Sequence, residues 1–181
     1  MNTFSFTIIF LAIGSSVTAY VWATTSGSLR KHTRSIFTGA VLIQWFAVML
    51  HLFSGFIFPL PMELDVPVRS LGLTLFTVGV FLAVWAKYTM QNRWGIPGQH
   101  DAKSQNELVT SGPFSYTRNP IYVGAILMNF GIAIALKSAF VFIIFVIYNY
   151  FYTQVLIEEK LLKKIFGKSF VEYCKKVPRF I

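Results

Sequence analysis

The sequence predicts an all-helical integral membrane protein with about five transmembrane helices. Hydrophobic residues make up 55% of the 181 residues and charged residues only 13%, which is too few charges to cover a water-soluble globule. A helix needs roughly 20 mostly apolar residues to cross the hydrocarbon core, so a chain of this length has room for about five crossings. We therefore expect one membrane domain over 1–181, with N-terminal spans in 1–88 and a more polar region in 89–181.

Five apolar stretches mark the expected spans, at 4–23, 36–58, 71–86, 121–136 and 139–157. The first follows no basic residue and lacks a small residue at the outer cleavage position, so we interpret it as a retained span rather than a removable signal peptide. The last two stretches are separated only by Lys137 and Ser138. We expect them to form an antiparallel helical hairpin whose two open ends lie at the same membrane face.

The distribution of basic residues predicts the orientation of the spans, because Lys and Arg are enriched in cytoplasmic loops. Basic residues follow the first span (30–34) and the third span (87–118), whereas the connection at 59–69 holds two acidic residues and a single Arg. A lysine-rich tail (160–179) accounts for most of the net charge of +9. We therefore predict an N-terminus outside and a C-terminus in the cytosol, with the tail against anionic membrane lipids.

The same basic charge does not indicate nucleic-acid binding, because it lies beside the spans and forms no motif that reads bases. The single cysteine, Cys174, can form no internal disulfide and has no second metal ligand nearby in the sequence. We expect neither a nucleic-acid partner nor a metal site.

The stretch "SGPFSYTRNPIYVGAIL" (111–127) places polar residues at the start of the fourth span. Asn119 is a favoured N-cap, and Pro120 suits the first helical position. A helix N-terminus carries free N–H groups and about half a positive charge, and Arg118 adds a full charge, so this corner suits a carboxylate or a phosphate. Tyr122 supplies a hydroxyl. In the alternative interpretation, Arg118 only follows the bias of basic residues toward the cytoplasmic side, and Asn119 and Pro120 only cap the helix.

Glu158 and Glu159 form a second corner at the end of the fifth span, where the helix dipole disfavours negative charge. Lys163, one turn later, is one source of compensation. A ligand that carries a cation or hydroxyl donors is the functional alternative. Because the hairpin returns both span ends to one face, we expect Arg118 and Glu158 to be neighbours in space.

The two corners together fit S-adenosylmethionine, which combines a carboxylate, a cationic centre, ribose hydroxyls and an aromatic base. Aromatic side chains around the corners are able to face the base, although most of them suit an interfacial belt. They are Trp94, Phe114, Tyr116, Tyr122, Tyr148, Tyr150 and Tyr152.

The tail predicts a pair of amphipathic helices separated by Gly167. Leu161, Leu162, Ile165 and Phe166 form the apolar stripe of the first. A capping box at 169–172, of the form Ser-x-x-Glu, would start the second, whose apolar residues are Phe170, Tyr173, Cys174 and Val177. The pair would act as a lid, and a position among the lipid headgroups is an alternative interpretation that does not exclude this role.

Two segments, "LVTSGPFSYTRNPIYVG" and "EEKLLKKIFGKSFVEYCKKVPRFI", resemble the isoprenylcysteine carboxyl methyltransferase family and its phospholipid methyltransferase relatives. The resemblance covers about 94–181. The matching residues are Gly112, Pro113, Arg118, Pro120, Tyr122, Gly124, Glu158, Glu159, Leu162, Phe166, Gly167, Tyr173, Pro178 and Arg179. Asn119 departs from the pattern, because the family has a histidine there. Asn can also donate a hydrogen bond to a cofactor, but a proton-handling role at this position is lost.

The resemblance implies a polytopic membrane enzyme that takes S-adenosylmethionine from the cytosol and a lipophilic acceptor from the bilayer. It suggests Arg118, Glu158 and Glu159 as catalytic residues. The expected cofactor-binding residues are Arg118, Asn119, Pro120, Tyr122, Gly124, Glu158 and Glu159, and the expected substrate-binding residues are Trp94, His100 and Tyr152.

The sequence therefore predicts a membrane methyltransferase whose acceptor is a carboxylate, a thiol or an amine. The short chain looks more like prokaryotic members of the family, so we expect it in a prokaryotic cytoplasmic membrane. His100 and Glu107 are candidate bases for an amine acceptor, since an ammonium must first lose a proton.

Polar residues within the spans either mark the route of the acceptor or hydrogen-bond between helices; they are Gln44, His51, Asn129, Asn149 and Gln154. Two other functions fit the same features, namely a non-catalytic small membrane protein (lipid-binding or transporter-associated) and a membrane reductase of similar architecture.

Overall fold

The computed structural model describes residues 3–25, 46, 48–53, 65–90 and 107–180. Every regular element in this part of the chain is helical, which confirms the all-helical prediction for it. The elements are α1 (Thr3–Thr25), α3 (Asp65–Met90), α4 (Pro120–Ala135), α5 (Ile143–Phe166) and α6 (Lys168–Lys176), with 3-10 turns η3 (Gly112–Ser115) and η4 (Ala139–Phe142).

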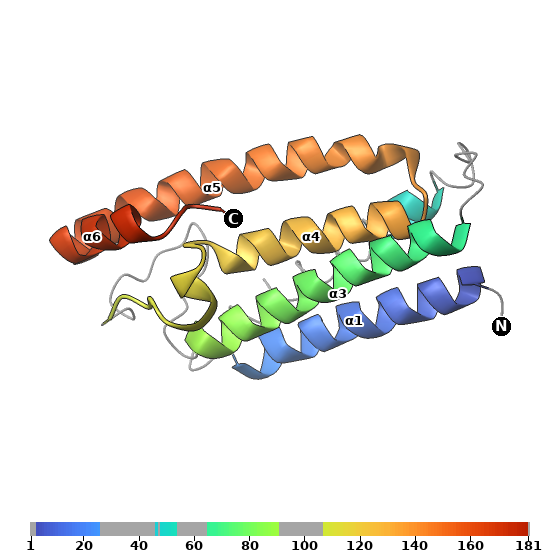
Figure 1. Ribbon diagram of the computed structural model, residues 1–181, viewed down its shortest axis with the longest axis horizontal. Helices are drawn as coiled ribbons and strands as arrows, with labels where there is room; N and C mark the ends of the chain where they lie inside the picture. Colours follow the sequence, from blue (N-terminus) through green and yellow to red (C-terminus); the bar gives the residue numbers. More distant parts are fainter. Residues whose placement is uncertain (1–2, 26–45, 47, 54–64, 91–106, 181) are drawn as a thin grey trace.

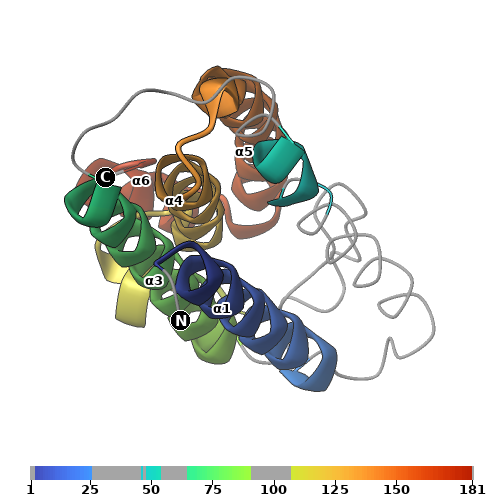
Figure 2. The same cartoon turned by 90° about the vertical axis from the view of Figure 1, so that its right-hand side faces the viewer.

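The long helices lie along one axis (Figure 1). α3 packs between α1 and α4, and α5 lies on the far side of α4 (Figures 1 and 2). The start of α1 and the end of α4 share one end of the molecule, while the start of α4, the end of α5 and α6 share the other (Figure 1). This arrangement brings the polar segments at 111–119 and 158–180 to the same end.

Glycines allow α3 and α4 to pack with their backbones almost in contact. A Cβ atom added to Gly79 would lie 2.6 Å from the carbonyl oxygen of Gly124, and one added to Gly124 would lie 2.8 Å from that of Gly79. Gly72 and Gly131 meet in the same way two turns farther along both helices. Small residues at such contacts favour helix association in membranes, because close backbones gain van der Waals contact and weak Cα–H···O bonds.

The main apolar cluster lies along the same helices. Phe76 and Ile132 are fully buried at its centre, and Leu11, Val48, Met128 and Leu136 complete it. The cluster therefore joins α1, α3 and α4 with the short helical piece at 48–53.

Two of the described helices, α1 and α3, are long and apolar enough to cross a membrane, and α4 is a shorter apolar helix. α3 is longer than the span expected at 71–86: Asp65 and Pro67 start it, and it continues past Lys87 to Met90. The expectation that Lys87 is a loop residue is wrong, because 87–90 contain no helix breaker. Its side chain is buried, with the ammonium 5.9 Å from the centre of the Trp22 ring. Most of the second stretch (36–58) lies outside the described residues; the described part, 46 and 48–53, is helical.

The boundaries of α5 also differ from the expected span at 139–157. The chain reverses after α4 through Lys137, whose φ of 51° is left-handed, and Ser138 N–H donates to the Ala133 carbonyl. Residues 139–142 form the turn η4, so α5 begins only at Ile143. At its other end, α5 runs without a break through Glu158 and Glu159 to Phe166.

Asp65 joins three elements at the end of the molecule that holds the start of α1. Its carboxylate forms ion pairs with Arg69 (2.9 Å) and Lys137 (2.8 Å), and Thr3 donates a longer hydrogen bond to it. Ser138 follows Lys137 in the sequence, and its buried side chain lies 2.8 Å from the buried side chain of His51 in the short helical piece at 48–53. These contacts fix the turn after α4 to α3 and α1.

Both asparagines named inside the expected spans hydrogen-bond to their own helices. Asn129 donates to the Ala125 carbonyl and Asn149 to the Phe145 carbonyl, each one turn earlier. The interpretation of these two residues as interhelical hydrogen-bond partners is therefore not supported by their contacts, whereas the contact of His51 with Ser138 does link separate segments.

Candidate functional site

The site begins with a tight turn that leads from η3 into α4. Gly112 has a φ of +60°, and a Cβ atom there would lie 2.9 Å from Thr89 at the end of α3. Glycine is therefore favoured both by the left-handed backbone and by the close approach. Phe114 is buried, so the turn fixes the position of the following residues against α3.

Asn119 and Pro120 start α4 as the sequence predicts, but Asn119 does not cap the helix with its side chain. Its side-chain amide instead donates a hydrogen bond to the carbonyl oxygen of Arg179 (3.0 Å). The first hydrogen bond of α4 runs from Val123 N–H to the Asn119 carbonyl. The N–H groups of Ile121 and Tyr122 precede it and, among the described residues, have no hydrogen-bond partner.

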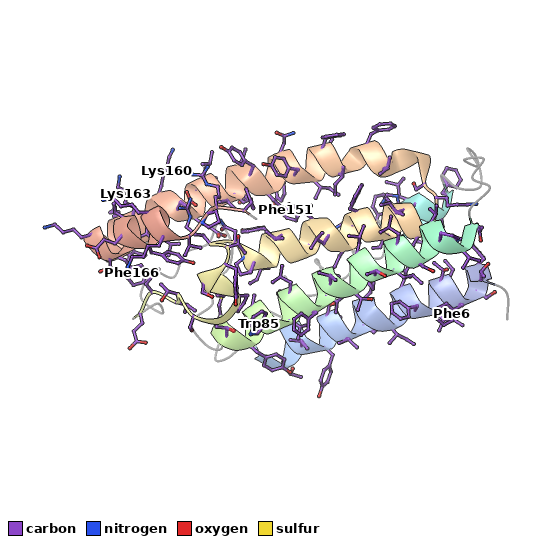
Figure 3. All side chains as sticks on the ribbon, viewed as in Figure 1. Phe6, Trp85, Phe151, Lys160, Lys163 and Phe166 are labelled. Carbon is purple, nitrogen blue, oxygen red and sulfur yellow. The ribbon has the colours of Figure 1, made fainter. Side chains whose placement is uncertain are left out.

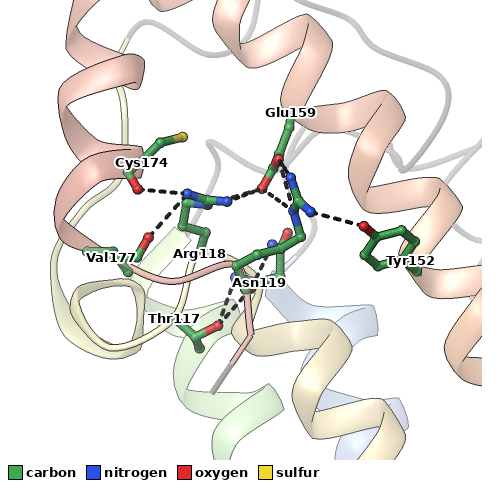
Figure 4. Close-up of polar contacts among 8 residues, drawn as sticks. Thr117, Arg118, Asn119, Tyr152, Glu159, Cys174 and Val177 are labelled. Atoms are coloured by element: carbon green, nitrogen blue, oxygen red, sulfur yellow. Dashed lines mark hydrogen bonds and ion pairs between the residues drawn. The ribbon is translucent and has the colours of Figure 1, made fainter.

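Glu159 lies between two arginines (Figure 4). Its Oε1 accepts hydrogen bonds from Arg118 Nε (3.0 Å) and Arg179 Nε (3.1 Å), and its Oε2 accepts one from Arg179 Nη2 (2.8 Å). The side chains of Arg118 and Glu159 are 11% and 13% exposed, and that of Arg179 is 32% exposed. The hydrogen bond with Glu159 raises the pKa of Arg179, so the arginine stays charged. Compensation of Glu159 thus comes from these arginines and not from Lys163.

The C-terminal segment, defined here as 177–180, closes this cluster. Arg118 donates from Nη1 to the carbonyls of Cys174 (3.0 Å) and Val177 (3.2 Å), and its backbone N–H donates to the Pro178 carbonyl (2.9 Å). The Thr117 hydroxyl donates to the Arg179 carbonyl (3.1 Å). The start of α4, the end part of α5 and the C-terminal segment therefore form one polar network (Figure 4).

Glu158 has different surroundings, because it faces α4. The Tyr122 hydroxyl donates a hydrogen bond to its Oε1 (2.6 Å). Burial raises the pKa of the Glu158 carboxyl, and the hydrogen bond from Tyr122 opposes part of that rise. The expectation that the two glutamates stand at a helix end is wrong, since α5 continues to Phe166 and the helix dipole does not act on them there.

Aromatic rings line the network on the α5 side. The Arg179 guanidinium lies 5.5 Å from the centre of the Tyr152 ring and donates to its hydroxyl (3.3 Å). Tyr148, Tyr152 and Phe180 pack together, with Tyr148 and Tyr152 stacked at 6.1 Å. Phe151 points from α5 toward α4 and contacts the Tyr122 ring, whereas Lys160 and Lys163 point away from the bundle (Figure 3).

Not every residue assigned from the sequence lies in this network. Tyr152 does, but Trp94 and His100 fall outside the described residues. Gly124 faces α3, where it forms the close helix contact, and not the charged cluster. Pro120 is fully buried at the first position of α4. With Tyr152, the assigned residues that the structure brings together are Arg118, Asn119, Tyr122, Glu158 and Glu159.

Gly167 ends α5 as predicted, with a left-handed φ of 53°. The predicted capping box at 169–172 is wrong, because α6 starts at Lys168 and Gly167, which has no side chain, occupies its N-cap. The apolar side of α6 is covered by the protein itself. Phe170, Tyr173 and Val177 are buried against other parts of the chain, including Leu108, Leu162 and Phe166.

Tyr173 fixes α6 to the turn before α4, and its removal tests that contact. Its hydroxyl donates to the Phe114 carbonyl (2.6 Å), and burial raises its pKa to about 12. We expect Tyr173→Phe to leave this carbonyl without a donor and to lower the unfolding free energy by about 1–3 kcal/mol. Thermal unfolding of the purified protein in detergent measures the loss, and Tyr116→Phe, at an exposed position of the same turn, is the control. Equal midpoints for both variants would contradict the expected role of the hydrogen bond.

Two contributors were missed by residue-level reasoning on the sequence. Arg179 supplies half of the charge around Glu159, and Thr117 binds the Arg179 backbone. Arg179 belongs to the motif that resembles the family, so its position in "VPRF" could have identified it as a site residue. The sequence around Thr117 contains no such indication.

Comparisons with known proteins agree with the motifs. The chain matches the phospholipid methyltransferase family over residues 68–169, which include Arg118, Glu158 and Glu159. It is 31% identical over 142 residues to protein-S-isoprenylcysteine O-methyltransferase of Saccharomyces cerevisiae, covering 73% of this chain and 58% of the yeast protein.

Two further relatives carry similar names. Protein-S-isoprenylcysteine O-methyltransferase B of Arabidopsis thaliana is 28% identical over 113 residues, covering 61% of this chain and 57% of the plant protein. The Homo sapiens protein-S-isoprenylcysteine O-methyltransferase is 28% identical over 109 residues, covering 59% of this chain and 38% of the human protein. The chain thus spans little more than half, or less, of these relatives. Because the family match covers more than half of the chain, the chain belongs to the phospholipid methyltransferase family.

Proposed function

We propose that this protein is an integral membrane methyltransferase that transfers a methyl group from S-adenosylmethionine to a lipophilic acceptor at the cytoplasmic face of the membrane. The observation that carries the proposal is the joining of Arg118 to Glu159, and of Tyr122 to Glu158, at one end of the helices, within a chain that belongs to a methyltransferase family. The non-catalytic and reductase alternatives have no comparable support.

The groups that remain free in the network fit the parts of S-adenosylmethionine. The unpartnered N–H groups of Ile121 and Tyr122, beside Arg118, suit its carboxylate. A guanidinium has five N–H donors, and the bonds of Arg118 leave one of them, on Nη2, available for a ligand. Glu158 suits its ammonium or ribose hydroxyls, and the rings of Tyr148, Tyr152 and Phe180 suit its adenine.

The cofactor supplies an electrophilic methyl group on a sulfonium sulfur. The side chains of this chain hold the reacting groups in line and exclude water, and such positioning supplies roughly 7–11 kcal/mol of a reaction barrier. A carboxylate acceptor is already ionised and needs no base. An amine acceptor must lose a proton, and Glu158, whose pKa is raised by burial, is a described carboxyl that suits this task.

The proposal includes five spans, with the helices before and after 136–142 forming a hairpin. The site end then faces the cytosol, since the lysines of α5 and α6 lie there, and the Asp65 end faces outside. α4 supplies 16 residues, a length of about 24 Å at 1.5 Å per residue. That is somewhat less than a hydrocarbon core of about 30 Å, so we expect local thinning or interfacial anchoring around it.

The acceptor class is tested with methyl-labelled S-adenosylmethionine and the purified protein in lipid nanodiscs. A farnesylated cysteine offers a carboxylate and phosphatidylethanolamine offers an amine. We expect label in a lipid-extractable product, released by mild base if the product is an ester. Lys160→Gln, at an exposed position of α5, is the control and should retain full activity. No label transfer to either acceptor or to a total lipid extract, together with no calorimetric binding of the cofactor, would disprove the proposal.

A further inference from the structure

We infer that the two adjacent glutamates of α5 have different tasks: Glu159, with Arg179, positions the C-terminal segment, and Glu158 contacts the ligand. The ligand contact rests on the proposed function, whereas the positioning role does not. Consecutive residues of a helix point about 100° apart, so the pair faces two different neighbours. Glu159 faces the C-terminal segment and Glu158 faces α4.

The bonds of Glu159 leave it little capacity for a ligand. Both of its oxygens accept charge-assisted hydrogen bonds from arginines at 2.8–3.1 Å, and its side chain is only 13% exposed. A ligand would have to displace Arg118 or Arg179 to reach it. Charge-assisted bonds of this kind are about twice as strong as neutral ones, so such displacement is costly. Glu159 therefore acts through the two arginines.

Arg179 transmits this positioning to the backbone of the C-terminal segment. Its guanidinium binds Glu159 and Tyr152 on α5, while its carbonyl accepts hydrogen bonds from Thr117 and Asn119 before α4. One residue thus connects both elements that carry the site. Asn119, which stands where the family has histidine, takes part in this connection rather than in proton transfer.

Glu158, in contrast, has an oxygen to offer. Tyr122 is its single hydrogen-bond partner among the described residues, and the bond uses Oε1. A carboxylate has about four acceptor sites, so Oε2 is able to accept from an ammonium or hydroxyl group. The neighbouring cluster of Arg118, Arg179 and Glu159 carries one net positive charge, which suits the anionic part of the same ligand. Opposite charges of a zwitterionic ligand thus have separate partners.

The isosteric variants Glu158→Gln and Glu159→Gln separate the two tasks. Three measurements are made on each full-length protein in detergent: thermal unfolding, trypsin cleavage after Lys176, and calorimetric titration with S-adenosylmethionine. We expect Glu158→Gln to keep the unfolding midpoint and the cleavage rate, because Gln still accepts from Tyr122 and burial disfavours the charge. Its cofactor affinity should fall at least tenfold.

Glu159→Gln should lower the midpoint and speed cleavage even without ligand, because two arginines lose their counter-charge. The double variant Glu159→Gln/Arg179→Gln should be less destabilised than the sum of the two single variants, since one unneutralised cation is removed. Arg179→Lys keeps the positive charge but should hold the C-terminal segment less firmly than arginine does. A lysine lacks the planar guanidinium that binds Glu159 and Tyr152 at the same time.

The inference is wrong if Glu159→Gln leaves unfolding and cleavage unchanged, or if Glu158→Gln binds the cofactor as tightly as the parent protein. If the parent protein binds no cofactor, the proposed function and the ligand contact of Glu158 both fail. The unfolding and cleavage measurements still decide the positioning role of Glu159 in that case.

Discussion

Replacing Arg118 with alanine is expected to abolish measurable cofactor binding and to lower the unfolding free energy by about 3 kcal/mol. Removing one partner of a buried ion pair costs about 3–5 kcal/mol, and the lower value applies because Arg179 still neutralises Glu159. Alanine also leaves the carbonyls of Cys174 and Val177 without their donor. The loss of binding follows because the same side chain supplies the positive charge beside the start of α4.

Arg118→Lys distinguishes charge from geometry at this position. Lysine keeps the charge but presents one ammonium in place of a planar group, so it is unable to bind Glu159 and both carbonyls at once. We expect it to recover less than half of the lost stability and to bind the cofactor at least tenfold more weakly than the parent protein. Thermal unfolding and calorimetry measure the two effects. The control variant Lys160→Ala removes an exposed charge of α5 and should change neither the unfolding midpoint nor the cofactor affinity. If Arg118→Lys were as stable as this control and bound the cofactor as tightly, a positive charge alone would be sufficient at position 118.

The start of α4 was predictable because its signals are local. Asn119 and Pro120 occupy the expected positions. The short link at Lys137 and Ser138 led us to expect Arg118 beside Glu158, whereas the structure pairs Arg118 with the next residue, Glu159, and Glu158 with Tyr122. Local sequence signals do not indicate which distant residue a side chain will hydrogen-bond to. Asn119 was expected to bind the helix and instead binds Arg179, because the C-terminal segment brings a carbonyl oxygen within its reach.

Helix lengths were misjudged where charge was taken to end a span. α3 continues through Lys87, whose ammonium lies near the Trp22 ring. α5 continues through Glu158, which accepts a hydrogen bond from Tyr122, and through Glu159, which is paired with two arginines. In both places a tertiary partner removes the cost of the charge, and the sequence alone does not reveal that partner. The capping box at Ser169 failed for a related reason: Gly167 already reverses the chain, so α6 starts earlier.

Substitutions at the glycine contact between α3 and α4 are expected to cause a large loss of stability, because they disturb the packing of the helices and not the binding of a ligand. In Gly79→Ala, the new Cβ would lie 2.6 Å from the Gly124 carbonyl oxygen and 2.7 Å from the Met128 nitrogen. Both are backbone atoms, which no side-chain rotation moves away, so the helices must separate. Overpacking of this kind costs about 1–3 kcal/mol, and the better helix propensity of alanine offsets at most about 1 kcal/mol.

We therefore expect Gly79→Ala to lower the unfolding midpoint in detergent, and Gly79→Leu to lower it much further because a larger side chain forces a wider separation. Val78→Leu adds volume at the neighbouring position, which is 49% exposed and points away from α4, and should leave the midpoint unchanged. Since Gly124 belongs to the same contact, Gly124→Ala combined with Gly79→Ala should cost less than the two changes separately: once the helices have moved apart, the second methyl group meets less resistance. Full additivity of the two losses would mean that the glycines act independently and that the close backbone approach is not what stabilises this helix pair.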